Sequence, residues 1–184
     1  MTEFTFHDET TAPEESRPLL EKSKAAFGRL PGLHKVMAEA PGLLNGYKTL
    51  WQLFGESSLS PVEQQVVYMT ANFENNCAYC VPWHTYLMVT GKMPADVIEA
   101  LRNGTDLPDP KLQALHVFAK GLLDTRGHVG DDALQAFLDA GYENRQALEV
   151  VLGLAVKLMS NFTNAIAHTE LDDPPKAYAW TKPV

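Results

Sequence analysis

The chain has 184 residues, of which 45% are hydrophobic and 9% aromatic, a length and apolar content that suit one domain with one sizeable core. Its 15 Lys and Arg are outnumbered by 23 Asp and Glu, giving a formal net charge of −8, so we expect no nucleic-acid or membrane partner. The longest apolar runs, such as 150–156, are far shorter than the roughly 20 residues that span a bilayer. The acidic N-terminus lacks the pattern of a secretory signal, and we expect a soluble, cytoplasmic protein.

Turn residues divide the chain into short segments with helical periodicity. The best-marked start is at Ser60, a candidate N-cap that Pro61 and Glu63 follow at the first and third helical positions. The other segments combine helix formers or apolar side chains at i, i+3 and i+4 spacing with a terminal glycine or proline, and residues 30–32 form a turn. In chain order, the predicted helices are residues 18–27, 41–54, 60–74, 83–89, 94–104, 109–127, 130–141 and 146–168.

No segment shows the sustained alternation of a β-strand, and the Asn-Gly pairs lie in helical surroundings rather than between strands. The predicted fold class is therefore all-α. The last helix, 146–168, carries apolar side chains almost all round. A helix of this composition is normally buried by its own bundle or by another subunit, so we also expect a homo-oligomer.

The only two cysteines, Cys77 and Cys80, form a CxxC pair in the run NNCAYCVPWH. In a reducing cytosol, such a pair is usually half of a metal site or a redox couple. A structural zinc site needs four ligands, and the local sequence offers only two thiolates and His84. We therefore expect no metal and no organic cofactor. The alternative interpretation is that both cysteines are small buried hydrophobes and His84 is an ordinary core or surface histidine.

A redox role requires an ionised thiol, with a pKa below the ordinary value of about 8.5. Asn75 and Asn76 are candidate N-caps of a helix that would hold the cysteines in its first turn, near unpaired N–H groups. Pro82 fits best near a helix start and places that start as late as Val81. His84 follows Cys80 by four residues, which brings its imidazole to the same helix face as that sulfur.

The run NNCAYCVPWH, preceded by the capped helix 60–74, resembles the AhpD-like core of the carboxymuconolactone decarboxylase superfamily, in its peroxidase-related branch. The resemblance implies a single AhpD-like helical bundle over residues 16–184, with the CxxCxxxH core at about 60–90. Residues 1–15 are then a polar N-terminal arm.

The same resemblance implies thiol peroxidase chemistry and assigns roles to three residues. Cys80 corresponds to the peroxidatic cysteine, Cys77 to the resolving cysteine, and His84 to the histidine of a proton relay. The implied partners are a small-molecule peroxide and an external dithiol or a disulfide reductant protein. The resemblance also suggests a trimer or a hexamer.

One position departs from the family motif. The relay glutamate expected twelve residues before the first cysteine is Gln65 here, and an amide does not exchange a proton near neutral pH. Glu63 and Glu74 are the nearest carboxylates, and eleven residues of α-helix place them on one face, roughly opposite Gln65. We favour Glu74 as the substitute because it is closer to the cysteines; the alternative is that it is a solvated acid at a helix end.

Two further features have open interpretations. The last helix carries a polar stripe of Lys157, Asn161, Asn164 and His168, which we expect to be its solvent-exposed face, the alternative being that it lines the pocket above the cysteines. Tyr79 and Trp83 lie beside the thiols in sequence and are candidates for the wall of a peroxide pocket. Two other functions stay open, a carboxymuconolactone decarboxylase-like enzyme and a non-catalytic redox-sensing module.

Overall fold

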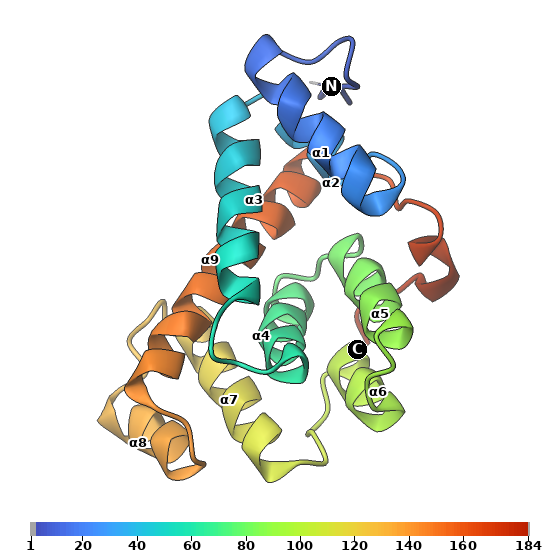
Figure 1. Cartoon of the computed structure of the whole chain (residues 1–184). Coiled ribbons are helices and arrows are strands. Elements are labelled where there is room, and N and C mark those ends of the chain that lie inside the picture. The colour runs from blue at the N-terminus through green and yellow to red at the C-terminus, as the bar shows by residue number, and fades with distance from the viewer. Residues whose placement is uncertain (1–2, 184) are drawn as a thin grey trace.

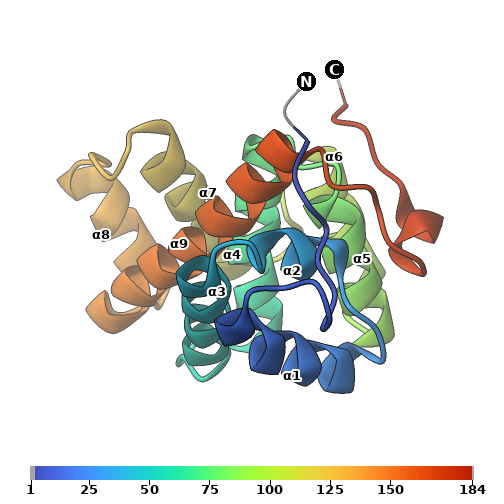
Figure 2. The same ribbon diagram turned by 90° about the horizontal axis from the view of Figure 1, so that it is seen from above.

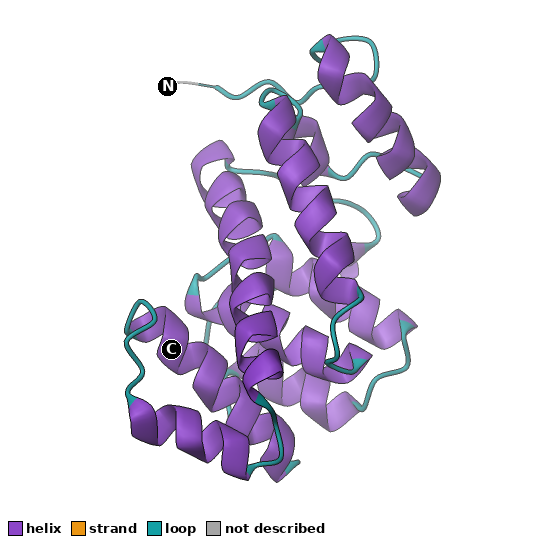
Figure 3. Cartoon of the chain, turned by 60° about the vertical axis from the view of Figure 1, so that its left-hand side comes forward, coloured by secondary structure: helices purple, strands orange, loops and turns teal. Residues whose placement is uncertain are grey.

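The computed structural model describes residues 3–183, and all regular secondary structure in this range is helical (Figure 3). The α-helices are α1 (Arg17–Phe27), α2 (Gly32–Met37), α3 (Pro41–Gly55), α4 (Pro61–Glu74), α5 (Cys80–Thr90), α6 (Ala95–Asn103), α7 (Pro110–Asp124), α8 (Asp131–Asp139) and α9 (Asn144–Ala167). Two 3-10 helices, η1 (Glu14–Ser16) and η2 (Pro175–Tyr178), complete the set. The all-α prediction is confirmed.

Most helices start and end close to the residues that the sequence predicts. At Ser60 the capping box is complete, because its side chain accepts from the backbone N–H of Glu63 while the Glu63 carboxylate accepts from the N–H of Ser60. The exception is α2, which replaces the turn expected at 30–32. This helix has only six residues, too few for a periodicity to stand out. It is held by burial, since Leu33, Val36 and Met37 are all at most 5% exposed.

Helix α4 lies at the centre of the bundle and packs against α5, α7 and α9 (Figure 1). Helix α3 runs beside α9, and α1 and α2 lie over one end of α4 and α5 (Figures 1 and 2). One hydrophobic cluster connects side chains from Ala12 to Val156. The chain leaves α9 and passes beside α5, where η2 packs. The division of the chain into an arm of residues 1–15 and a domain of 16–184 stays a prediction.

Helix α9 is 24 residues long and apolar enough, by length and composition, to cross a membrane, with a mean hydropathy of 1.4 over its most apolar 18 residues. In the bundle, however, 56% of that stretch is buried, as in the core helix of a soluble protein. Gly153 allows the close approach: a Cβ there would lie 2.6 Å from the ring of Phe54 and 2.8 Å from Val67. The absence of a side chain at Gly153 therefore lets α9 pack closely against α3 and α4.

Candidate active site

The turn between α4 and α5 places the two cysteines in different local structures. Asn76 adopts a left-handed conformation, with φ at 51°. Its N–H donates to the carbonyl of Phe73, and the N–H of Cys77 donates to that of Asn72 over 2.9 Å. This is a Schellman motif, so Asn75 and Asn76 end α4, and the prediction that they cap the following helix is wrong.

Helix α5 begins at Cys80, one residue before the latest start that Pro82 suggests. Cys80 therefore lies in the first helical turn, where unpaired N–H groups favour an anion, and Cys77 lies in the turn that precedes it. Pro82 is tolerated because the first-turn N–H groups have no intrahelical acceptors. The two thiols therefore meet the helix terminus differently: Cys80 is its first residue, and Cys77 lies just before it with its sulfur facing the first backbone N–H of the helix.

The two thiols are free, buried and in contact with each other. Cys77 is 6% and Cys80 2% exposed, and the backbone N–H of Cys80 donates to the sulfur of Cys77 over 3.2 Å. A hydrogen bond to Cys80, together with burial, raises the pKa of the Cys77 thiol. Cys77 is therefore the thiol that keeps its proton.

The pKa of Cys80 moves in the opposite direction. Burial raises it, but the hydrogen bond from Cys77, the charge of Lys157 and hydrogen bonds from Asn161 and Asn164 outweigh burial and bring the pKa down to about 6. The amide of Asn164 donates to the Cys80 sulfur over 3.3 Å. At neutral pH, Cys80 is the thiolate and the stronger nucleophile.

Besides Cys77, the groups that lower the pKa of Cys80 come from α9. Lys157, Asn161 and Asn164 are at most 5% exposed, so the expectation that this stripe faces solvent is wrong for these three residues. Only His168 is exposed, at the C-cap of the helix. The reason is the packing of α9 against α4, which turns the polar stripe inward.

His84 links this stripe to Gln65. Lys157 Nζ lies 3.0 Å from His84 Nε2. Burial lowers the pKa of Lys157, and the neighbouring Cys80 thiolate opposes that shift. With Lys157 protonated beside the thiolate, its ammonium group can only donate, so Nε2 accepts and the imidazole proton lies on Nδ1. Nδ1 then donates to Gln65 Oε1 over 2.7 Å. Burial and the charge of Lys157 hold the pKa of His84 well below its ordinary value, and the imidazole is neutral.

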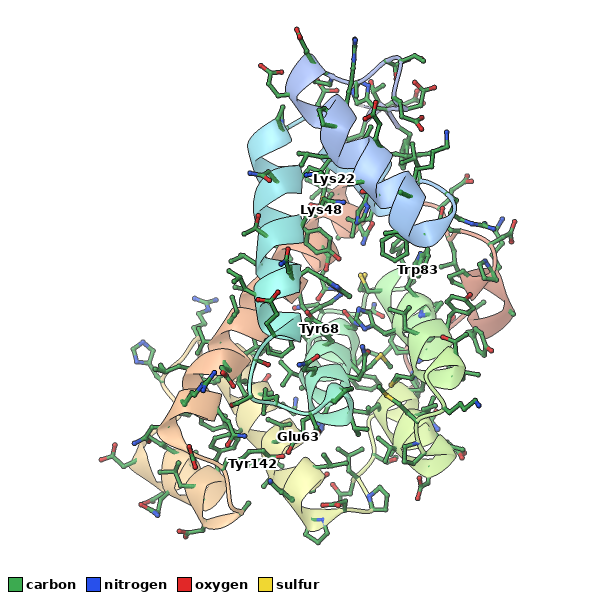
Figure 4. The ribbon with its side chains drawn as sticks, viewed as in Figure 1. Lys22, Lys48, Glu63, Tyr68, Trp83 and Tyr142 are labelled. Atoms are coloured by element: carbon green, nitrogen blue, oxygen red, sulfur yellow. The ribbon has the colours of Figure 1, made fainter. Side chains whose placement is uncertain are left out.

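Glu63 and Glu74 do not reach the sulfurs. Glu63 closes the capping box at the start of α4 and lies 3.6 Å from Lys111 Nζ. In Figure 4 it lies beside Tyr142, away from Trp83. Glu74 forms an ion pair with Lys120 at 2.8 Å. Both carboxylates lie on the side of α4 opposite Gln65, as helix geometry requires. Neither of them contacts Cys80 or His84, so no contact supports a role as relay acid for either one.

A cavity of about 260 Å³ opens over Cys80, and His84 and Lys157 also line it. Tyr79 and Trp83, which adjacency alone suggested, are both part of its wall. Asp172, from the segment after α9, holds these two rings in place, since it accepts from the Tyr79 hydroxyl and from the Trp83 indole N–H. No local sequence signal marks Asp172 for this role.

Within residues 3–183, no three His, Cys, Asp or Glu side chains gather in an arrangement that would hold a metal ion. The ammonium group beside His84 also opposes a divalent cation there, because like charges repel strongly in a buried site. The geometry is that of a thiolate next to a fixed cation.

The carboxymuconolactone decarboxylase family model matches residues 42–120, a segment that contains both cysteines and His84. The structure is similar to an alkylhydroperoxidase AhpD core, an uncharacterized peroxidase-related protein from Ralstonia eutropha JMP134, with a TM-score of 0.82 and 17% identity over 94% of this chain and 93% of that one. The chain therefore has an AhpD-like fold, and its segment 42–120 matches the carboxymuconolactone decarboxylase family model. This confirms the resemblance that the CxxCxxxH run predicts.

Other AhpD-like structures extend the comparison. A peroxidase-related protein from Silicibacter sp. TM1040 aligns with a TM-score of 0.77 and 18% identity, over 94% of each chain. The debrominase Bmp8 aligns with a TM-score of 0.78 and 17% identity, over 96% of each chain. A comparison with curated protein sequences finds no match. At 17 to 18% sequence identity, structural similarity shows the fold but not the reaction. The reaction has to be inferred from the geometry of the site.

Proposed function

We propose that this protein is an enzyme, a thiol-dependent hydroperoxide reductase in which Cys80 attacks the peroxide and Cys77 resolves the product. The observation that carries the proposal is the asymmetry of the two thiols. Cys80 is ionised beside Lys157 and Asn164 at the wall of a cavity, and Cys77 stays protonated with its sulfur against the Cys80 backbone. The peroxidase-related proteins of the same fold support this assignment.

The reaction follows from these positions. The Cys80 thiolate attacks the terminal oxygen of a hydroperoxide, the O–O bond breaks, and the leaving alkoxide takes a proton to become an alcohol. Cys80 is then a sulfenic acid, which condenses with the Cys77 thiol to give a disulfide and one water. An external dithiol or a disulfide reductant protein reduces that disulfide by thiol exchange and restores both cysteines.

Lys157 takes the place that the resemblance gives to a carboxylate. The ammonium group stabilises the Cys80 thiolate by charge and lines the same cavity, so it is the acid that we propose to protonate the departing alkoxide. His84 orients it, because the Gln65 acceptor fixes the imidazole proton on Nδ1 and leaves Nε2 free to accept from Lys157. In this proposal Gln65 sets a tautomer and does not move a proton.

A second candidate is reductive dehalogenation. Bmp8 is a debrominase, and a cysteine-to-alanine variant of it has been crystallised with 2,3,4-tribromopyrrole. The aromatic wall of the present cavity favours a flat ligand of that kind. Here Cys80 would take bromine from carbon, the carbon would gain a proton, and Cys77 would displace bromide to form the same disulfide.

The test is steady-state consumption of hydroperoxides with a dithiol donor. Wild type turns over and Cys80→Ser does not; Cys77→Ser reduces one equivalent and stops. The proposal fails if Cys80→Ser matches wild type, or if wild type is inert with several hydroperoxides and donors. Carbon dioxide release from a muconolactone that survives loss of both cysteines supports a decarboxylase instead, and stoichiometric oxidation without turnover supports a redox sensor.

We also propose that the protein works as a homo-oligomer, a trimer or a hexamer, in the cytoplasm. The support for the oligomer is the outer face of α9. Large apolar side chains there point to solvent at helical spacing, namely Leu148, Val151, Leu158, Phe162 and Ile166. Contiguous apolar surface of this kind is typical of an interface between proteins, and a second copy of the chain presents a matching face.

A further inference from the structure

The cavity over Cys80 is walled by aromatic rings that contact one another in sequence. Neighbouring ring centroids are 5.6 to 6.1 Å apart along the series Trp83, Phe27, His34, Tyr47, Trp51 and His84. All six side chains line the cavity. They come from α1, α2, α3 and α5, so four separate helices converge to build the ring. His84 and Trp83, the two ends of the series, are neighbours in the chain, so the series closes into a ring. We call these six side chains the aromatic ring wall.

The size of the cavity suits one small ring. Its volume is about 260 Å³, and an apolar cavity of about 150 Å³ is already enough for benzene. Few polar groups in the wall are free for a ligand, because the Tyr79 hydroxyl and the Trp83 indole N–H are both held by Asp172. A small, fully polar peroxide would leave most of this apolar surface unused.

The charges around the cavity restrict the ligand further. Aromatic cages often bind cations. Among the described residues that line this cavity, however, two are lysines, Lys48 and Lys157, and none is an aspartate or a glutamate. Lys48 lies between α1 and α3, toward Trp83 (Figure 4). The two ammonium groups outnumber the one thiolate, that of Cys80, so the lining carries a net positive charge that disfavours a cationic ligand. The occupant is therefore a neutral or anionic ring.

One polar group in the wall is unpartnered. His34 is 6% exposed, and its Nδ1 has no hydrogen-bond partner within residues 3–183. Burial lowers the pKa of His34 to about 3, so the imidazole is neutral and offers one donor and one acceptor. The Nδ1 atom is fully buried, so His34 presents to the cavity an uncharged ring rather than an open hydrogen-bonding atom.

From the aromatic ring wall, the cavity volume and the two lysines, we propose that the substrate of this enzyme carries a planar, neutral or anionic aromatic ring, bound in the cavity with its reactive substituent directed to the Cys80 sulfur. This inference rests on the proposed function for its chemistry. For a hydroperoxide reductase, the preferred substrate is an aryl-substituted hydroperoxide rather than hydrogen peroxide or a simple alkyl hydroperoxide.

The first test compares cumene hydroperoxide with tert-butyl hydroperoxide, which share a tertiary carbon and differ by a phenyl in place of a methyl group. Wild type is expected to show a kcat/KM ratio of at least about 10 in favour of cumene hydroperoxide, since one aromatic contact contributes about 3- to 10-fold. Phe27→Leu lowers that ratio by about 3- to 10-fold. Phe6→Leu is the matched control, because Phe6 and Phe27 are both 41% exposed but only Phe27 lines the cavity. A wild-type ratio near one overturns the inference.

The second test does not depend on turnover. Binding of phenol and of cyclohexanol to Cys80→Ser is followed by tryptophan fluorescence, because Trp51 and Trp83 both line the cavity. Phenol is expected to bind at least about 3-fold more tightly than cyclohexanol, and Phe27→Leu to remove that preference. Equal binding of the two alcohols overturns the inference even if peroxides are consumed. A phenol preference without any peroxide consumption upholds the ring site and rejects the proposed reaction.

Discussion

Besides the buried apolar residues Val150, Leu154 and Val156, which pack in the core, α9 has polar side chains on its inward face and large apolar side chains on its outward face. The inward face carries Lys157, Asn161 and Asn164, all at most 5% exposed, whereas the outward face carries Phe162 at 58% and Ile166 at 63% exposure. A helix that only stabilised its own bundle would show the reverse pattern. Folding of the single chain alone explains neither set of residues: the inner ones contact the thiol, and the outer ones are those we propose to contact another subunit.

The inner face accounts for the largest expected effect. Lys157→Met removes the buried charge, and the pKa of Cys80 is expected to return at least to the ordinary value of about 8.5, where about 3% of the thiol is ionised at pH 7. The second-order rate of peroxide reaction at pH 7 should therefore fall about 30-fold. Cys80 takes up a proton when its cation is removed, so no unpaired buried charge is left behind, and thermal unfolding is expected to show an intact fold.

The matched control is Lys120→Met, which makes the same substitution at a lysine paired with Glu74 outside the cavity. It should leave the rate unchanged. Equal rates for wild type and Lys157→Met would show that the inner face of α9 does not activate the thiol.

The outer face predicts a change of assembly rather than of chemistry. Phe162→Glu places a charge in the exposed apolar row and is expected to dissociate the oligomer, which light scattering after gel filtration would report as a fall in molar mass. The alkylation rate of Cys80 should stay within about twofold, because its pKa is set by buried side chains. A wild-type protein that is already monomeric at micromolar concentration contradicts the proposed interface.

The smallest expected effect is at Glu74. Its ion pair with Lys120 lies at the surface, where such pairs contribute about 0 to 1 kcal/mol. Glu74→Gln should change neither the pH dependence nor kcat/KM by more than about twofold. A loss of activity comparable to that of Lys157→Met would show that the Glu74 carboxylate takes part in the reaction.

The sequence predicts most of the fold because helix periodicity and capping are local. Ser60 with Glu63, and the glycines that end other helices, mark their elements without reference to the rest of the chain. The six residues of α2 carry no such signal and are held by tertiary burial. The cap at Asn75 and Asn76 was assigned to the wrong helix because asparagine serves both as an N-cap and, in the left-handed conformation, at a C-terminus.

Only part of the candidate site consists of residues that are close together in the sequence. The spacing of Cys77, Cys80 and His84 is visible in the sequence, but Asn164 meets Cys80 across 84 residues and Lys157 meets His84 across 73. On an isolated helix, a polar stripe beside an apolar stripe indicates which side faces water. That rule fails for α9, because its apolar side chains extend from the core onto the exposed face and its polar stripe packs inward against the buried Cys80 thiolate.

The pKa of Cys80 is the most direct test of this account. It is measured from the pH dependence of iodoacetamide alkylation in Cys77→Ser, where a hydroxyl replaces the second thiol so that only one sulfur reacts, with and without Lys157→Met. A group with a depressed pKa becomes reactive as the pH rises through that value, so the rate should rise with a midpoint near 6 and move upward when Lys157 is removed. A midpoint near 9, the unperturbed value, or one that Lys157→Met does not move, would contradict the claim that α9 ionises Cys80.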